Sequence, residues 1–99
     1  MNTETPSYPD NAAQLMRLLE DRGINATSQR MEIADILLTK PQHLSADQVL
    51  AIAQRHGANV SKATVYNTLN LFASKGLVKA LIIDGNMVFV DSNTTDIYN

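Results

Sequence analysis

Four stretches of this chain place their apolar residues at the spacing of an α-helix. The predicted helices, with the residues that face inward, are 11–22 (Ala12, Leu15, Met16, Leu19), 27–40 (Ile33, Ala34, Leu37, Leu38), 45–56 (Ala46, Val49, Leu50, Ala53) and 61–75 (Val65, Leu69, Phe72). A glycine or a proline follows each stretch, which is typical of helix ends. The third helix also opens on a capping box, with Ser45 at the N-cap and Gln48 three residues later.

The pattern changes after Gly76, where aliphatic residues no longer follow helical spacing. Residues 77–83 and 87–90 are predicted strands, and Asp84-Gly85 between them is a strong hairpin-turn signal. Residues 42–44 are predicted to form a loop. The order of elements predicts an α+β, mostly helical fold, a winged helix-turn-helix with four helices followed by a two-stranded β-hairpin wing.

The helix over residues 61–75 has an outer face that carries hydrogen-bonding groups and no acid. At about 100° per residue, this face holds Ala63, Tyr66, Asn67, Asn70 and Ser74, while Ser61 is a suitable N-cap. A polar helix with a wing behind it fits a DNA-reading element. It also fits an ordinary amphipathic helix with a solvated back, and the helix alone does not decide between them.

Charge and composition narrow the function classes. The chain has 99 residues and a net charge of −2, yet no acid lies between Asp47 and Asp84, a span that holds Arg55, Lys62, Lys75 and Lys79. It has no cysteine, no long apolar run and no motif pairing a nucleophile with a base, so we expect a cytoplasmic protein that is neither an enzyme nor inserted in a membrane. We expect residues 1–9 to be a disordered tail, residues 10–91 to be the domain, and residues 92–99 to be a flexible stub.

Several motifs together resemble the DNA-binding domain of the ferric uptake regulator family. The shared residues are Thr27-x-x-Arg30, His43-Leu44-Ser45-Ala46-Asp47, Ala63-Thr64-Val65-Tyr66 and Gly76-Leu77-Val78, in that order and spacing. The resemblance covers about residues 11–96. Asn67 after Tyr66, and Val90-Asp91-Ser92-Asn93, resemble the peroxide-sensing and haem-responsive branches more than the iron-sensing branch.

The resemblance implies that the helix carrying Tyr66 enters the major groove of double-stranded DNA and reads an A/T-rich inverted repeat. It implies that Tyr66 contacts bases, that Asn67 can read adenine, and that Ser61, Lys62 and Thr64 position phosphates. Lys79 on the wing is a weaker candidate. Iron-sensing members have an Arg where this chain has Asn67, and often a Lys where it has Asn25, so we expect weaker or redirected binding.

Two of these cations have an alternative role open to them. Arg30 lies in the first turn of its helix, where a cation opposes the helix dipole, and it either pairs with a carboxylate or reaches a phosphate. Lys62 is either a solvated cation or a phosphate contact. Neither choice follows from sequence.

The resemblance also implies a metal site that this chain does not complete. His43 and Asp91 match family ligands, but Ile97 and Asn99 stand where the family has histidines. We therefore expect no cofactor in this chain, although family members respond to iron, manganese, zinc or haem-linked signals.

The family's dimerisation domain would follow residue 99, so we expect this chain to be a monomer that becomes a dimer when joined to that domain. Whether the chain is a fragment or naturally short stays open. The alternative function is a shortened protein-interaction module that pairs with another regulator, through Met87-Val88-Phe89 or the first helix, without binding DNA itself.

Overall fold

The computed structural model describes residues 8–92, which form four helices and a three-stranded sheet. The elements are α1 (Ala12–Glu20), α2 (Ser28–Leu38), β1 (His43–Leu44), α3 (Ala46–Arg55), α4 (Lys62–Ser74), β2 (Val78–Ile83) and β3 (Asn86–Asp91). The predicted winged helix-turn-helix fold is thus confirmed. Most of the predicted tail and stub lies outside the described residues, as do Ile97 and Asn99, and those expectations stay predictions.

Each helix begins at a side chain that accepts a hydrogen bond from the backbone of its first turn. Asn11, Thr27, Ser45 and Ser61 are the N-caps. At α3 the capping box is complete, because Ser45 and Gln48 each accept from the other's backbone nitrogen. These caps satisfy amides that the helix itself leaves unpaired.

The sheet has the order β1-β3-β2 and is antiparallel throughout. The prediction of a loop at residues 42–44 is wrong for two of these residues, since His43 pairs with Val90 and Leu44 with Phe89. The wing therefore has a third strand at its root. Asp84 and Gly85 both have positive φ, 52° and 79°, which is the backbone of a tight hairpin turn.

One hydrophobic core joins all four helices to the root of the sheet. Its largest fully buried side chains are Phe72, Phe89, Leu19, Ile33, Leu37, Leu38, Leu69, Val49, Val65 and Val78. The inward prediction is wrong for Ala12 and Met16 of α1, which are exposed, because α1 contacts the core through Leu15 and Leu19, with Leu18 partly buried beside them.

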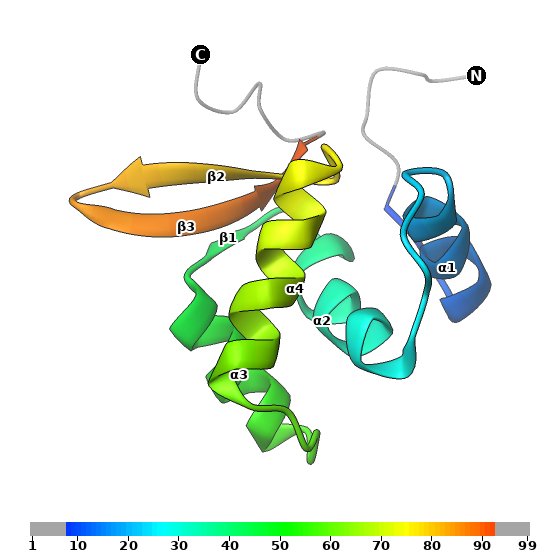
Figure 1. Ribbon diagram of the computed structural model, residues 1–99, viewed down its shortest axis with the longest axis horizontal. Helices are drawn as coiled ribbons and strands as arrows, with labels where there is room; N and C mark the ends of the chain where they lie inside the picture. Colours follow the sequence, from blue (N-terminus) through cyan, green and yellow to red (C-terminus); the bar gives the residue numbers. More distant parts are fainter. Residues whose placement is uncertain (1–7, 93–99) are drawn as a thin grey trace.

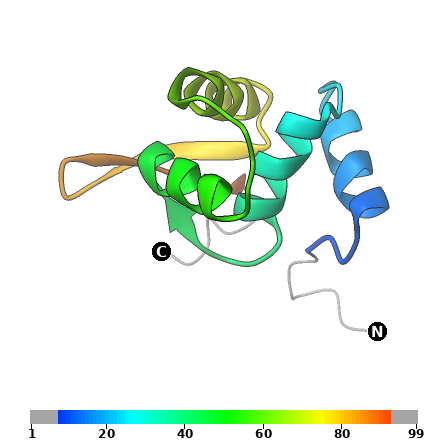
Figure 2. The same cartoon turned by 90° about the horizontal axis from the view of Figure 1, so that it is seen from below.

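The arrangement leaves α4 between the wing and the α1–α2 pair. In Figure 1, β2 and β3 extend well past the helices on one side, and α1 lies on the other. Figure 2 shows the hairpin nearly edge-on, with α4 on one side of it. Gly76, at the turn from α4 into β2, has a carbonyl that accepts from Arg22 Nη1 at 2.9 Å and from Ser92 Oγ at 2.8 Å.

Candidate nucleic-acid interface

The two faces of α4 lie as the sequence predicts. Val65, Leu69 and Phe72 are fully buried, whereas Tyr66 and Asn67 are exposed. Thr68 is also buried, which the spacing of the apolar residues did not indicate. The exposed face, which also includes Ala63 and Asn70, presents one aromatic ring and two amides.

Tyr66 lines a groove of about 520 Å³ between α4, the start of α3 and the wing. Asp47 from α3 and Asp84 from the wing turn line the same groove. In the sequence these two acids flank the stretch that contains no acid. In the fold both lie beside Tyr66, which belongs to that stretch. A gap in charge along the chain is therefore not a gap in charge on the surface.

Lys62 at the start of α4 is held between a carboxylate and an aromatic ring. Its Nζ lies 3.6 Å from Asp47 Oδ1 and 5.8 Å from the centre of the Tyr66 ring. Lys62 thus has a carboxylate and an aromatic neighbour while its side chain stays 64% exposed. The spacing i, i+4 between Lys62 and Tyr66 indicates their contact from sequence, whereas the approach of Asp47 depends on how α3 and α4 pack.

Ser61 and Thr64 form the cap of α4. The Thr64 amide donates to Ser61 Oγ at 3.1 Å, and the two hydroxyl oxygens are 3.0 Å apart. This puts two hydroxyls at the N-terminal end of a 13-residue helix, the end that carries positive partial charge. The arrangement is suited to a phosphate oxygen.

A second groove brings the start of α2 beside α4. It has a volume of about 490 Å³, and its lining residues are Thr27, Ser28, Gln29, Arg30, Thr64, Asn67 and Thr68. Arg30 and Asn67 therefore share one surface, as the DNA-binding hypothesis requires. Arg30 Nη1 donates to the Asn25 carbonyl at 3.1 Å, so in this structure the guanidinium holds the loop before α2 and pairs with no carboxylate of residues 8–92.

Lys79 lies apart from these residues. It is the second residue of β2, exposed and paired with Val90. Figure 1 shows β2 starting beside the C-terminal end of α4, whereas Lys62 starts the helix. Lys79 lines neither groove around Tyr66 or Asn67.

The two candidate metal ligands, His43 and Asp91, lie on the neighbouring strands β1 and β3. His43 pairs with Val90, so its side chain points to the same face of the sheet as that of Val90. The side chain of Asp91 then points to the opposite face. His43 is exposed and Asp91 buried. Within the part of the chain that the structure describes, no cluster of three or more His, Cys, Asp or Glu could hold a metal ion.

Asp91 instead affects the environment of Tyr8. Burial and the negative charge of Asp91 together raise the pKa of the Tyr8 phenol above its ordinary value of 10.0. The end of β3 thus faces the segment that precedes α1.

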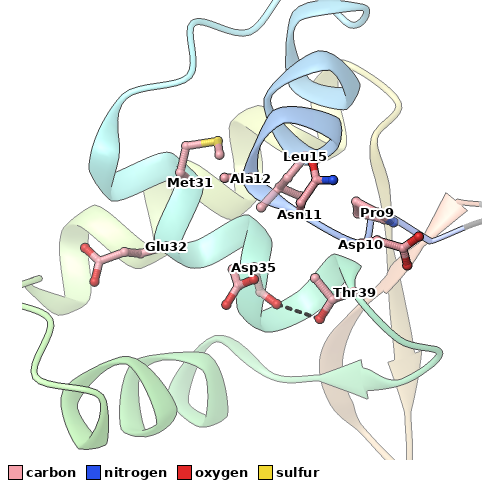
Figure 3. Close-up of a pocket in the computed structure, with 9 residues that line it drawn as sticks. All are labelled: Pro9, Asp10, Asn11, Ala12, Leu15, Met31, Glu32, Asp35 and Thr39. Carbon is pink, nitrogen blue, oxygen red and sulfur yellow. Dashed lines mark hydrogen bonds between the residues drawn. The ribbon is translucent and has the colours of Figure 1, made fainter.

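A further groove, which the sequence did not suggest, lies between α1 and α2. It has a volume of about 480 Å³ and is shown in Figure 3, where Asp10, Glu32 and Asp35 surround Leu15 and Met31. The Thr39 hydroxyl donates to the Asp35 carbonyl at 2.9 Å. With three acids and no cation among its lining residues, this groove is unsuited to phosphate. From residue 8 to residue 92, no helix is both long and apolar enough to cross a membrane.

Known proteins resemble this chain in sequence and in fold. The model of the ferric uptake regulator family matches residues 21–98. A peroxide-responsive repressor, PerR of Staphylococcus aureus, is 30% identical over 99 residues, which are 100% of this chain and 67% of the repressor.

Two solved structures share the fold. The Vibrio cholerae ferric uptake regulator superposes with a TM-score of 0.74 and 31% identity, over 81% of this chain and 63% of that one. The Pseudomonas aeruginosa ferric uptake regulator with manganese gives a TM-score of 0.69 and 31% identity, over 77% and 58%.

The chain spans about two thirds of the length of these relatives or less. Proteins of the matched family are transcription regulators that bind DNA and respond to metals or redox signals. The match covers most of the chain and agrees with the observed winged helix. This chain belongs to the ferric uptake regulator family.

Proposed function

We propose that this chain is the DNA-binding domain of a metal- or redox-responsive transcription regulator, and that α4 reads the bases. The observation that carries the proposal is the exposed face of α4, where Tyr66 and Asn67 stand between two grooves. A helix of this length fits the major groove. The family match supports the same assignment.

The side chains on this face divide into base contacts and phosphate contacts. The Tyr66 ring suits the methyl group of thymine, and the Asn67 amide suits the paired donor and acceptor of adenine. Ser61, Thr64 and Lys62 at the start of α4 suit phosphate. Arg30 and Asn25 extend the surface on the α2 side, and Lys79 adds a weaker contact from the root of the wing.

The operator we propose is an A/T-rich inverted repeat, because two copies related by a two-fold axis read two half-sites. If each copy is joined to a dimerisation domain, the two DNA-binding domains of the dimer would bind the two half-sites of one DNA molecule. Residues 10–91 alone would bind half-sites as monomers and lose the effective concentration that linkage supplies, a factor of about 10²–10⁴. Within residues 8–92 His43 and Asp91 belong to no group of three or more possible ligands, so a metal signal would need further ligands from outside these residues.

The experiment is fluorescence anisotropy with an A/T-rich inverted-repeat duplex and a scrambled duplex, at low and at physiological salt. The wild type should prefer the repeat and weaken as salt rises. Tyr66→Ala should remove about 1–3 kcal/mol of that preference, and Tyr66→Phe should keep most of it if the ring is the reader.

Met16→Ala is the matched control. Met16 is 41% exposed, close to the 37% of Tyr66, but it lies on α1 away from both grooves. It should bind both duplexes like the wild type. Equal binding of the two duplexes by the wild type at both salt concentrations would show that this chain does not read DNA sequence.

A second candidate function is the protein-interaction module. It is favoured by the two acids beside Tyr66, which repel phosphate. Val88 and Phe89 are buried, so the expected pairing surface at residues 87–89 is reduced to Met87, which pairs across the hairpin with exposed Ile82. Pairing through these apolar side chains should resist salt, whereas DNA binding should not.

A further inference from the structure

We propose that Asp47 is a positioning residue that competes with phosphate for Lys62 and thereby sets the strength and the salt dependence of DNA binding. The proposal rests on the proposed function of α4. It assigns a role to an acid that the sequence placed outside the DNA-binding set. Its basis is the chain of contacts from Asp47 through Lys62 to Tyr66.

The first link is the ion pair. Lys62 Nζ lies 3.6 Å from Asp47 Oδ1, and the two side chains remain 64% and 67% exposed. An exposed pair of this kind is weak and opens readily. Asp47 therefore holds Lys62 in the free protein without preventing its release when a stronger anion approaches.

The second link is the ring. The same ammonium lies 5.8 Å from the centre of the Tyr66 ring, near the outer limit of a cation–π contact. Lys62 and Tyr66 are four residues apart, on neighbouring turns of one face of α4. While Asp47 holds Lys62 there, the cation partly covers the residue proposed to read bases.

These two links couple phosphate binding to base reading. When a phosphate replaces Asp47 as the partner of Lys62, the ammonium moves off the ring and leaves Tyr66 open to the base. The phosphate has to break the ion pair before it can bind Lys62, and this opposes its binding. Lys62 therefore contributes less than a free lysine would to the affinity and to the number of counterions released.

The position of Asp47 is fixed by its helix. It lies in the first turn of α3, between the two capping-box residues Ser45 and Gln48, where a carboxylate is favoured by the helix dipole. The other acid of the groove, Asp84, is on the wing turn, and the structure pairs it with no lysine or arginine of residues 8–92. Asp84 thus supplies a control acid that lines the same groove without touching Lys62.

The test measures binding of the A/T-rich duplex across a series of salt concentrations. Asp47→Asn should bind about two- to fivefold tighter at low salt, with a slope of log affinity against log salt that is steeper by about one. Lys62→Gln should bind more weakly with a shallower slope. The double variant should match Lys62→Gln alone, because Asp47 acts through Lys62.

Two further variants separate this role from general effects of charge and helix stability. Asp47→Glu should keep the wild-type slope, since it keeps a carboxylate that can pair with Lys62 and a negative charge at the start of α3. Asp84→Asn should tighten binding equally in the wild-type and Lys62→Gln backgrounds, because Asp84 repels phosphate directly and does not act through Lys62. Thermal melting of every variant shows whether a change in affinity reflects a change in folding.

The possible failures differ from one another. If the wild type prefers its duplex but Asp47→Asn leaves affinity and slope unchanged, the role of Asp47 is refuted and the proposed function stands. The role is also refuted if Asp47→Asn tightens binding equally in the Lys62→Gln background. If neither the wild type nor any variant binds the duplex, both proposals are overturned.

Discussion

Replacing Gly76 with alanine tests how α4 is joined to the wing. Gly76 follows α4 with a φ of +78°, and an added Cβ would lie 2.9 Å from Arg22 Nη1. That nitrogen is the one that donates to the Gly76 carbonyl. Gly76→Ala therefore introduces both an unfavourable backbone conformation and a collision with a hydrogen-bonded side chain.

The cost has two parts. A left-handed conformation costs an alanine about 1–2 kcal/mol. If the guanidinium moves away, the lost hydrogen bond adds about 0.5–1.5 kcal/mol. The free energy of unfolding should fall by about 1.5–3.5 kcal/mol in total, and each kcal/mol should lower the melting temperature of a domain of this size by about 4–8 °C.

Gly57→Ala is the matched control, because Gly57 also follows a helix and has a φ of +81°, but its Cβ would meet nothing within 4 Å. It should show the conformational cost alone. Urea denaturation followed by circular dichroism gives both free energies. In an Arg22→Ala background, Gly76→Ala should cost no more than Gly57→Ala does.

Equal destabilisation by Gly76→Ala and Gly57→Ala in the wild-type background would refute the reasoning about Arg22. It would mean that the guanidinium shifts without loss and that its bond to the Gly76 carbonyl contributes nothing measurable. A neutral effect of both substitutions would refute the conformational part as well.

Three further predictions concern single side chains. Ser45→Ala removes the N-cap of α3 and should lower the free energy of unfolding by about 0.5–2 kcal/mol in urea melts. The pKa of Tyr8 is raised in the folded state, so its contribution to stability is present below the unfolded pKa and is lost as pH rises through the folded pKa. Alkaline melts of Tyr8→Phe should lack this loss of stability. Asp91→Asn should lower the pKa of Tyr8, as measured by spectrophotometric titration. Arg30→Ala removes the bond to the Asn25 carbonyl and should cost about 0.5–1.5 kcal/mol, with faster hydrogen exchange in the loop before α2; unchanged exchange there would contradict a structural role.

Features that depend on neighbours within one helical turn could be predicted from the sequence. Asn11, Ser45 and Ser61 each accept a bond from an amide three residues later, so the helix starts are encoded locally. The Asp84-Gly85 turn is encoded in the same way. The buried stripe of α4 followed because its core contacts repeat with the period of the helix itself.

Features that depend on partners distant in the sequence could not be predicted from it. The β1 strand has only two residues and exists because it pairs with β3, so nothing in its own pattern distinguishes it from a loop. The approach of Asp47 to Lys62 depends on the packing of α3 on α4. The motifs suggested a shared ligand site of His43 and Asp91, but the pairing that brings their strands side by side, with His43 opposite Val90, depends on the register of β1 on β3.

The short β1 strand has a mechanical consequence for the wing. β3 has a partner on both sides only at Phe89 and Val90, and towards the turn it pairs with β2 alone. A two-stranded ribbon is far more easily twisted and bent than a wider sheet. Stiffness therefore falls abruptly at Val88, and amide exchange should quicken beyond that point. The turn at Asp84 lies at the end of the flexible two-stranded part of the hairpin, whose three-stranded root is stiffer. Contact with a partner can therefore shift the turn without distorting the domain.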